Sequence, residues 1–462
     1  MSVTKLSKAN PLSWLASLRL TVVLLALSMY LVFVGTLAQV EEGIWQVVET
    51  YFRSIVVWVP FDVFRALLYP GSDTQWKGGH WFPGGFLVIG LLLVNLLAAH
   101  ATRFKIAGKG GRLWLGLGLI VVGSVVTGYT VLEPQTSATI QQDVMLMLAI
   151  WTVPMAVIAV GCFLVFGKRK AGIVLVHAGL ILMLLGEYIT GIGAEEGRMM
   201  IPEFGSSNLV VDAREVELAF VTENEDGGLT HVVVPESMIV SAKAKDKHIK
   251  DEALPLTVRI DAWMPNSTPL PRLAQNDPTN VVWSAAERPE VTGTEQSEDR
   301  PSAVVTLYDG GERVGQYTLS TWEYFKPVPV EVDGKAWEVA LRFKHMPLDY
   351  TLQLNDFRHD TFTGTRTARN YSADLWLQTA DDAGSRDAYI KMNQPLRYDG
   401  KAFFQSGFFQ KPMNRNLGTI LQVADNPGAW VPYLSCVIVT VGLTVHFVAS
   451  LTRFGRRTIA KA

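Results

Sequence analysis

Six long apolar runs constrain the possible folds of this chain more than any other feature of its sequence. Each run is uncharged or nearly so and is long enough to cross the ~30 Å hydrocarbon core of a bilayer. They account for a chain of 462 residues that is 49% hydrophobic and only 18% charged. We therefore predict a membrane protein with six transmembrane α-helices, at Leu20–Gln39, Gly84–Thr102, Leu113–Leu132, Met147–Phe166, Gly172–Ile192 and Trp430–Leu451.

Basic residues beside these runs predict the orientation of the helices. Lysine and arginine cluster before the first run, between the second and third, between the fourth and fifth, and after the sixth. Because basic loops stay in the cytoplasm, we expect both termini to be cytoplasmic and the large segment 193–429 to be periplasmic. The first run is too long for a cleaved signal peptide, so we expect a retained anchor in a bacterial inner membrane.

The segment between the fifth and sixth runs has the pattern of a β-rich extracytoplasmic domain. Leu256–Trp263 and Thr351–Asn355 alternate apolar and polar residues, as strands with one buried face do. Asp333-Gly334 and Asp399-Gly400 are typical of tight hairpins. The acidic stretch Ser284–Pro301 predicts a loop. We therefore divide the chain into a membrane region at 1–192 with five helices, a β-rich domain at 193–429, and a last helix with a basic tail at 430–462.

Composition excludes several kinds of function. The net charge is −2, so no basic excess points to nucleic acid. The two cysteines, Cys162 and Cys436, both lie in apolar runs, which excludes a disulfide framework, a CxxC redox pair and a cysteine-rich metal site. Redox chemistry in this chain must therefore use groups other than thiols.

Three of the eight histidines lie inside the apolar runs, where an ionisable side chain is costly and faces a protein interior. His100 is near the predicted cytoplasmic end of the second run, His177 is one or two turns above the start of the fifth, and His446 is at a similar height in the sixth. Three different helices thus offer imidazole at one level of the membrane.

Two interpretations of these histidines stay open. Each can donate a structural hydrogen bond to a neighbouring helix. Alternatively, a metal-porphyrin needs one or two neutral imidazoles from facing helices, and its anionic propionates favour nearby cations. Such cations are present at Arg103, Lys105, Arg453 and Arg456, although membrane topology alone also predicts basic clusters at helix ends.

Other membrane functions fit the sequence less well. No run carries two histidines, which argues against a cytochrome that holds two haems across the bilayer. A proton-coupled transporter would use Glu187 and Asn95, but the two halves of the membrane region show no repeated pattern. We expect the remaining histidines to be solvated or hydrogen-bonded at the surface, namely His80, His231, His248, His345 and His359. Among them, His80 is the one candidate for handling haem on the outer side.

Several motifs resemble the ResB/CcsB family of cytochrome c biogenesis proteins. Asn393–Ser406 (NQPLRYDGKAFFQS) is the most specific. The other motifs resemble segments of the family and follow the same order along the chain as they do in the family: Ser17–Leu25, Val176–Gly186, Glu196-Gly197, Ile201–Glu203, Leu254–Val258, Leu354–Phe357, Tyr371–Leu375 and Asp425–Trp430. The family usually has four membrane spans. This chain therefore contains an additional pair, Leu113–Leu132 and Met147–Phe166.

The resemblance implies a subunit of the system II cytochrome c synthase, which moves haem across a membrane and attaches it to apocytochrome c. It implies a transient b-type haem, a CcsA/ResC-type haem-handling partner, the apocytochrome and a thioredoxin-like thiol reductant. Such a subunit is expected to be non-catalytic alone, within a holocytochrome c synthase complex.

The family's membrane haem-ligand position maps best to His100, and His446 is the second choice as an iron ligand. His177 also matches a family histidine, for which packing is nearly as good an explanation. The alternative function is a haem-free membrane scaffold whose β-domain recruits other assembly factors.

Overall fold

Long apolar helices and alternating strands separate the chain into two units. The computed structural model describes residues 11–40, 42–69, 76–132, 144–224, 227–274, 277–291, 299–364, 368–380, 384–410 and 417–459. The first unit comprises Met1–Glu195, Gln394–Phe403 and Ala424–Ala462, and the second comprises Glu196–Asn393 and Phe404–Val423.

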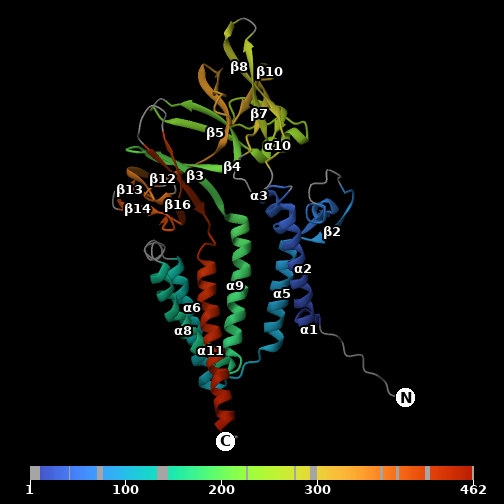
Figure 1. The fold of residues 1–462 in the computed structure, drawn as a ribbon, viewed down its shortest axis with the longest axis vertical. Helices are drawn as coiled ribbons and strands as arrows, with labels where there is room; N and C mark the ends of the chain where they lie inside the picture. The colour runs from blue at the N-terminus through green and yellow to red at the C-terminus, as the bar shows by residue number, and fades with distance from the viewer. Residues whose placement is uncertain are drawn as a thin grey trace, which may run out of the picture. The chain divides into compact units, whose positions relative to one another are not determined.

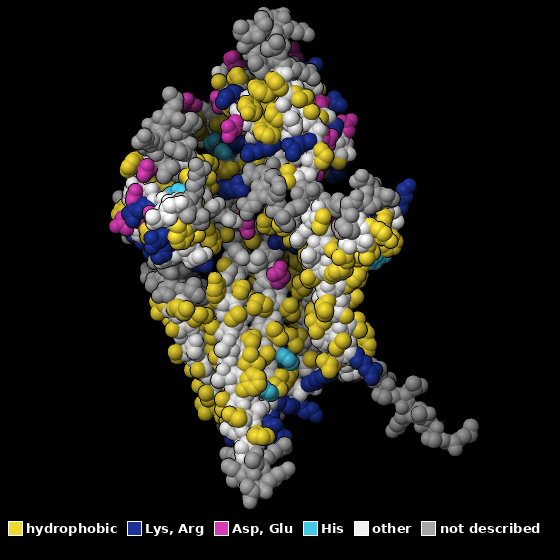
Figure 2. Space-filling model, in the orientation of Figure 1, with side chains coloured by type: hydrophobic (Ala, Val, Ile, Leu, Met, Phe, Trp, Pro, Cys, Tyr) yellow, Lys and Arg dark blue, Asp and Glu magenta, His cyan; other side chains and the backbone are white. Residues whose placement is uncertain are grey.

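The first unit contains the membrane helices. Among the described residues, six helices have stretches of 19 to 25 residues that are long and apolar enough to cross a bilayer. Hydrophobic side chains are spread over their visible surface (Figure 2). The prediction of a multi-pass membrane protein with six spanning helices is therefore confirmed. The helices are α2 (Leu18–Ala38), α5 (Gly85–Arg103), α6 (Gly110–Leu132), α8 (Val144–Phe166), α9 (Ala171–Gly193) and α11 (Val431–Ile459).

Glycine allows close contact between α9 and α11, which lie side by side in Figure 1. Gly172, Gly179 and Gly186 are seven residues apart, about two helical turns, so they share one face of α9. A Cβ at Gly172 would lie 2.6 Å from the Gly442 carbonyl oxygen and 2.7 Å from the His446 backbone nitrogen. Packing of small residues thus joins these two helices, as is common within membranes.

The additional helix pair, α6 and α8, packs in the same way. A Cβ at Gly161 of α8 would lie 2.7 Å from the carbonyl oxygen of Gly116 on α6. Trp151 of α8 is buried and donates from its indole nitrogen to Thr130 of α6 at 3.1 Å. α8 also contacts both α9 and α11, so the pair is part of the first unit's helix packing.

Short elements connect α2 to α5. Their buried side chains, among them Val47, Tyr51 and Val57, pack against Leu31 and Val34 of α2. The elements of this region, with α1 before α2, are α1 (Pro11–Leu15), α3 (Ile44–Val47), the π-helical turn η1 (Val48–Phe52), β1 (Val56–Pro60), the 3-10 turn η2 (Phe61–Phe64), α4 (Arg65–Leu68) and β2 (Gly79–Pro83). β1 and β2 pair antiparallel.

Most of the remaining strands form one ten-stranded sheet. Its order is β14-β13-β12-β4-β3-β17-β16-β15, with β11 also paired to β12 and β5 to β4. The strands are β3 (Glu195–Pro202), β4 (Ser206–Glu223), β5 (Leu229–Pro235), β11 (Val328–Val332), β12 (Lys335–Thr361), β13 (Ala368–Thr379), β14 (Arg386–Lys391), β15 (Leu396–Tyr398), β16 (Lys401–Gln410) and β17 (Leu417–Asp425).

A three-stranded sheet and one helix pack on this large sheet. β6 (Thr257–Met264), β9 (Ser302–Asp309) and β10 (Glu312–Ser320) form the smaller sheet, and α10 is Glu236–Ala244. Leu218 and Phe220 of β4, Leu341 of β12, Ile239 of α10 and Val305 of β9 belong to the core between them. The prediction of a large β-rich region is confirmed.

The predicted hairpins form as expected. Asp333 and Gly334 have φ values of 51° and 73° between β11 and β12, and Asp399 and Gly400 have 49° and 74° between β15 and β16. Positive φ at both turn residues is what a tight hairpin requires.

The predicted acidic loop is partly wrong, because Ser284–Glu287 belongs to β8 (Asp277–Glu287), which pairs with β7 (Ser267–Ala274). Residues 292–298 of that stretch lie outside the described residues.

Candidate functional site

The packing of α5 against α9 brings His100 and His177 together. Their ring centroids are 5.1 Å apart and the rings meet edge to face at 71°. The ring of Phe104, which follows α5, packs on both, at 4.7 Å from His100 and 5.8 Å from His177. These distances are those of direct aromatic contact, so the two imidazoles are immediate neighbours.

Hydrogen bonding fixes the tautomer of His100. Its Nδ1 lies 3.0 Å from the carbonyl oxygen of Leu96, one turn earlier in the same helix. A carbonyl only accepts, so Nδ1 carries the proton and Nε2 keeps a lone pair. Nε2 of His100 and Nδ1 of His177 are both buried and have no hydrogen-bond partner within the described residues. Buried nitrogens of this kind are suited to bind a metal.

Hydrogen bonding between helices does not account for this pair. The one side-chain hydrogen bond of His100 stays within α5, and the His177 side chain has no hydrogen bond to another described residue. The contact between α5 and α9 at this level is therefore aromatic packing that leaves a lone pair uncommitted.

His446 lies elsewhere. Its backbone on α11 contacts Gly172 of α9, and its ring packs 5.8 Å from that of Phe447. His177 follows Gly172 by five residues, which rotates it by about 140° around α9. It therefore faces away from α11. The structure thus pairs His100 with His177 and leaves His446 on the other side of α9.

Two cations near His100 are engaged with the backbone. Arg103 donates through Nη2 to the Ala16 carbonyl at 2.6 Å, and Lys170 Nζ donates to the Arg103 carbonyl at 3.1 Å. Lys105 and Arg453 are exposed, and nothing is described of the Arg456 side chain. Figure 2 shows histidine side chains at the surface of the helical region, with lysine and arginine below them.

Asn95, the polar residue considered for a transporter, has a structural role instead. Its amide nitrogen donates to the carbonyls of Leu15 at 2.5 Å and Ser17 at 3.2 Å, and its oxygen accepts from the Thr21 hydroxyl at 2.7 Å. Asn95 is buried, so these bonds satisfy it and join α5 to the start of α2. Glu187 of α9 is exposed on the helix surface.

Two of the remaining histidines also have an unpartnered ring nitrogen. His80 Nε2 lies 2.8 Å from the Tyr30 hydroxyl, and His359 stacks on Tyr371 at 4.7 Å. The buried nitrogens without a described partner are Nδ1 of His80 and Nε2 of His359.

The other three histidines lie in the second unit. His248 stacks on Tyr308 at 5.3 Å. His231 and His345 line a cavity of the second unit that is described below.

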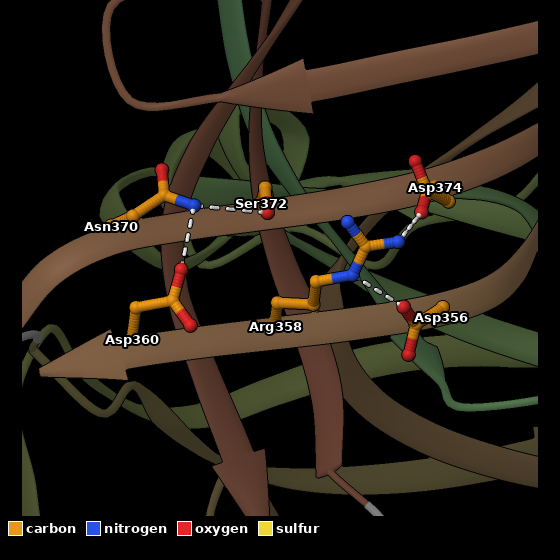
Figure 3. Close-up of polar contacts among 6 residues, drawn as sticks. All are labelled: Asp356, Arg358, Asp360, Asn370, Ser372 and Asp374. Carbon is orange, nitrogen blue, oxygen red and sulfur yellow. Dashed lines mark hydrogen bonds and ion pairs between the residues drawn. The ribbon is translucent and has the colours of Figure 1, made fainter.

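A polar row crosses β12 and β13, where two of the family-like motifs lie (Figure 3). Arg358 donates to Asp356 at 2.6 Å and to Asp374 at 2.5 Å, and these carboxylates raise its pKa. The two aspartates face each other across the strand pair, so Arg358 relieves their repulsion. Among the described residues, no group of three or more His, Cys, Asp or Glu side chains could hold a metal ion, so the row is assigned to strand pairing.

Comparison with known proteins gives two matches. Residues 328–418 match the family model of the ResB-like family. Protein NrfI of Wolinella succinogenes is 29% identical over 123 residues, which is 27% of this chain and 13% of NrfI. The family-matched segment contains Leu354–Phe357, Tyr371–Leu375 and Asn393–Ser406, three of the motifs found by inspection. The segment from β11 to the start of β17 is therefore ResB-like, and the resemblance to the ResB family is confirmed.

Proposed function

We propose that this chain acts in cytochrome c biogenesis as the haem-handling membrane subunit of a system II synthase. The observation that carries the proposal is the buried, unpartnered Nε2 of His100 beside His177. The match of residues 328–418 to the ResB-like family also supports the proposal. In this proposal haem is the cargo, and the side chain that binds its iron is His100.

The residues around His100 have separable tasks. The Leu96 carbonyl holds the proton on Nδ1, which keeps Nε2 free to bind iron. Phe104 packs against both imidazoles and excludes water from their apolar side. Because the two rings are in direct contact, one imidazole at a time is available unless the helices separate. His177 is thus a neighbouring acceptor and not a simultaneous second ligand in this conformation.

The remaining steps belong to the complex. A CcsA/ResC-type partner would receive the haem, and the CxxCH thiols of a reduced apocytochrome would form the thioethers. Neither Cys162, which is buried in α8, nor Cys436 on α11 is needed for that chemistry. The chain therefore supplies binding and positioning, and the holocytochrome c synthase activity belongs to the assembled complex.

Haem titration of purified protein tests the ligand. We expect His100→Ala to weaken haem binding at least ~10-fold, which corresponds to ~1.4 kcal/mol, because alanine offers iron no lone pair. Added imidazole should partly restore the Soret band by entering the space that the substitution leaves. His446→Ala is the matched control, since it removes the same side chain at a similar depth on the other side of α9.

Three outcomes separate the possibilities. Loss of haem in His100→Ala alone supports the assignment to the α5–α9 pair. Equal loss in His446→Ala would make His446 a second ligand, which contradicts its placement here. If both variants keep full haem content and full cytochrome c maturation, the chain is a haem-free scaffold.

A further inference from the structure

A cavity of about 770 Å³ opens on one face of the second unit's large sheet. Leu218, Phe220 and Leu341 point into the main core. Side chains alternate along a strand, so their neighbours face the opposite side. Val221 of β4 and Ala340 of β12 lie on that side and line the cavity. The cavity therefore extends over the face of the sheet that points away from the core, although Leu341 of the core also borders it.

One wall of the cavity is aromatic. Trp322 and Phe325 belong to the segment between β10 and β11 and line the cavity. The Trp322 indole donates to the Ser267 carbonyl at 3.1 Å, and the Arg300 guanidinium lies 5.8 Å from its ring. These contacts fix the wall in place. The volume lies within the ~300–1,000 Å³ that is usual for ligand pockets.

Three basic residues line the floor of the cavity. Arg342 and His345 belong to β12, whose register against β4 shifts between Phe343 and His345, and His231 belongs to β5. The Arg342 guanidinium lies 3.4 Å from His231 Nδ1, and all three side chains line the cavity.

The charge on this floor is already balanced. Arg342 is paired at 2.8 Å with Glu217, whose side chain is only 7% exposed. Burial, and then the charge of Arg342, lowers the pKa of His345 to about 4. Two further lining carboxylates, Glu323 and Glu338, are exposed and have no ion pair among the described residues. The unbalanced charge of the cavity is therefore negative.

We propose that this cavity binds a short segment of another polypeptide that is apolar and carries lysine or arginine. Apolar side chains would pack on Val221, Ala340 and the aromatic wall, and the cations would meet Glu323 and Glu338. The faces of aromatic rings also attract cations. An anionic partner is disfavoured, because Glu217 already occupies the guanidinium that would receive it. The inference does not depend on haem binding by the membrane helices.

The test uses the full chain in nanodiscs of uncharged phosphatidylcholine. The probe is a fluorescein-labelled, amidated heptapeptide of alternating leucine and lysine, and its binding is measured by anisotropy against empty nanodiscs. We expect saturable binding that weakens with salt, because rim charges act through screened electrostatics. A peptide of alternating leucine and glutamate should not bind.

Charge reversal locates the site. The double substitution Glu323→Lys and Glu338→Lys should weaken binding of the leucine–lysine peptide at least ~10-fold. Glu252→Lys with Glu312→Lys is the matched control, because both carboxylates are exposed on the second unit and do not line the cavity. The proposal is overturned if the control pair of substitutions weakens binding of the leucine–lysine peptide as much as the cavity pair does, or if the cavity pair leaves that binding unchanged. It is also overturned if the wild type binds the leucine–glutamate peptide as tightly as the leucine–lysine peptide. Haem titration of the same variants should match the wild type, which separates this test from that of His100.

Discussion

His345 shows how one residue can make the stability of the second unit depend on pH. Its folded-state pKa is lowered to about 4 from the ordinary 6.5, first by burial and then by the charge of Arg342. Between those values the unfolded chain binds more protons than the folded one. The contribution of His345 is therefore complete above pH 6.5 and is lost as pH falls towards 4.

Thermal unfolding of the full chain at pH 7 and pH 5 tests this effect. Between pH 6.5 and pH 5 the pKa shift implies about 2 kcal/mol, and partial solvent exposure reduces that to the order of 1 kcal/mol. A domain of this size loses about 2–4 °C of melting temperature per kcal/mol. Glutamine does not titrate, so we expect the melting temperature of the His345→Gln variant to fall less between pH 7 and pH 5 than that of the wild type. The same loss in both proteins would show that other groups cause it.

The individual site residues could be predicted only in part. The apolar runs predicted His100, His177 and His446 as imidazoles at one depth in the membrane, because depth follows from position along a helix. Which imidazoles meet depends on how α9 is rotated between α5 and α11. The glycines at positions 172, 179 and 186 carry that information, since they mark the face towards α11 and leave His177 on another face. Reading that spacing would have favoured His177 over His446 as the neighbour of His100.

At the scale of elements, the glycine face of α9 determines how closely two spanning helices approach. In Gly172→Ala the new Cβ would lie 2.6 Å from the Gly442 carbonyl oxygen and 2.7 Å from the His446 nitrogen. Both are backbone atoms, so α9 and α11 must separate. We expect the melting temperature of the purified protein to fall by several degrees, because overpacking costs ~1–3 kcal/mol.

Gly118→Ala on α6 is the matched control for that substitution. It makes the same chemical change within a spanning helix, but nothing lies within 4 Å of its new Cβ. Alanine also favours a helix over glycine by up to ~1 kcal/mol, so the control should be neutral or slightly stabilising. A loss in Gly118→Ala equal to that in Gly172→Ala would mean that helix packing at Gly172 is not the cause.

The elements themselves differ in how well the sequence predicts them. Each spanning helix was placed to within a few residues at its N-terminal end, because hydropathy over such a length has few alternatives. The strand β12 was missed as a unit. Its 27 residues change register at Phe343, and the sequence showed only the alternating part around Leu352. A bulge interrupts alternation without a turn residue to mark it.

For the whole molecule, long-range pairing is what the sequence alone could not supply. β12 pairs with β4, more than a hundred residues earlier, and β3 lies next to β4 in the same sheet. Alternation indicates that a strand has one buried face but not which strand lies beside it. The confirmed architecture therefore rests on local signals, namely six apolar runs and a β-rich segment. The order of the strands required the structure.

The orientation of the molecule is the last prediction, and it decides where the His100 pair lies. Lys105 and Lys109 lie between α5 and α6, and Lys168 and Arg169 lie between α8 and α9. Basic short loops stay cytoplasmic, so both connections should face the cytoplasm. His100 is within about one turn of the first connection, which would place the pair near the cytoplasmic surface.

Reporter fusions measure this directly. Alkaline phosphatase is active only outside the cytoplasm and green fluorescent protein folds well inside it, so each junction receives both reporters in turn. Junctions after Lys170 and after Ala462 should give cytoplasmic signals, and one near Gly293, which lies outside the described residues, should give an external signal. A cytoplasmic signal near Gly293 would invert every helix. The His100 pair would then lie at the outer surface, and haem uptake by these helices from the cytoplasm would have to be abandoned.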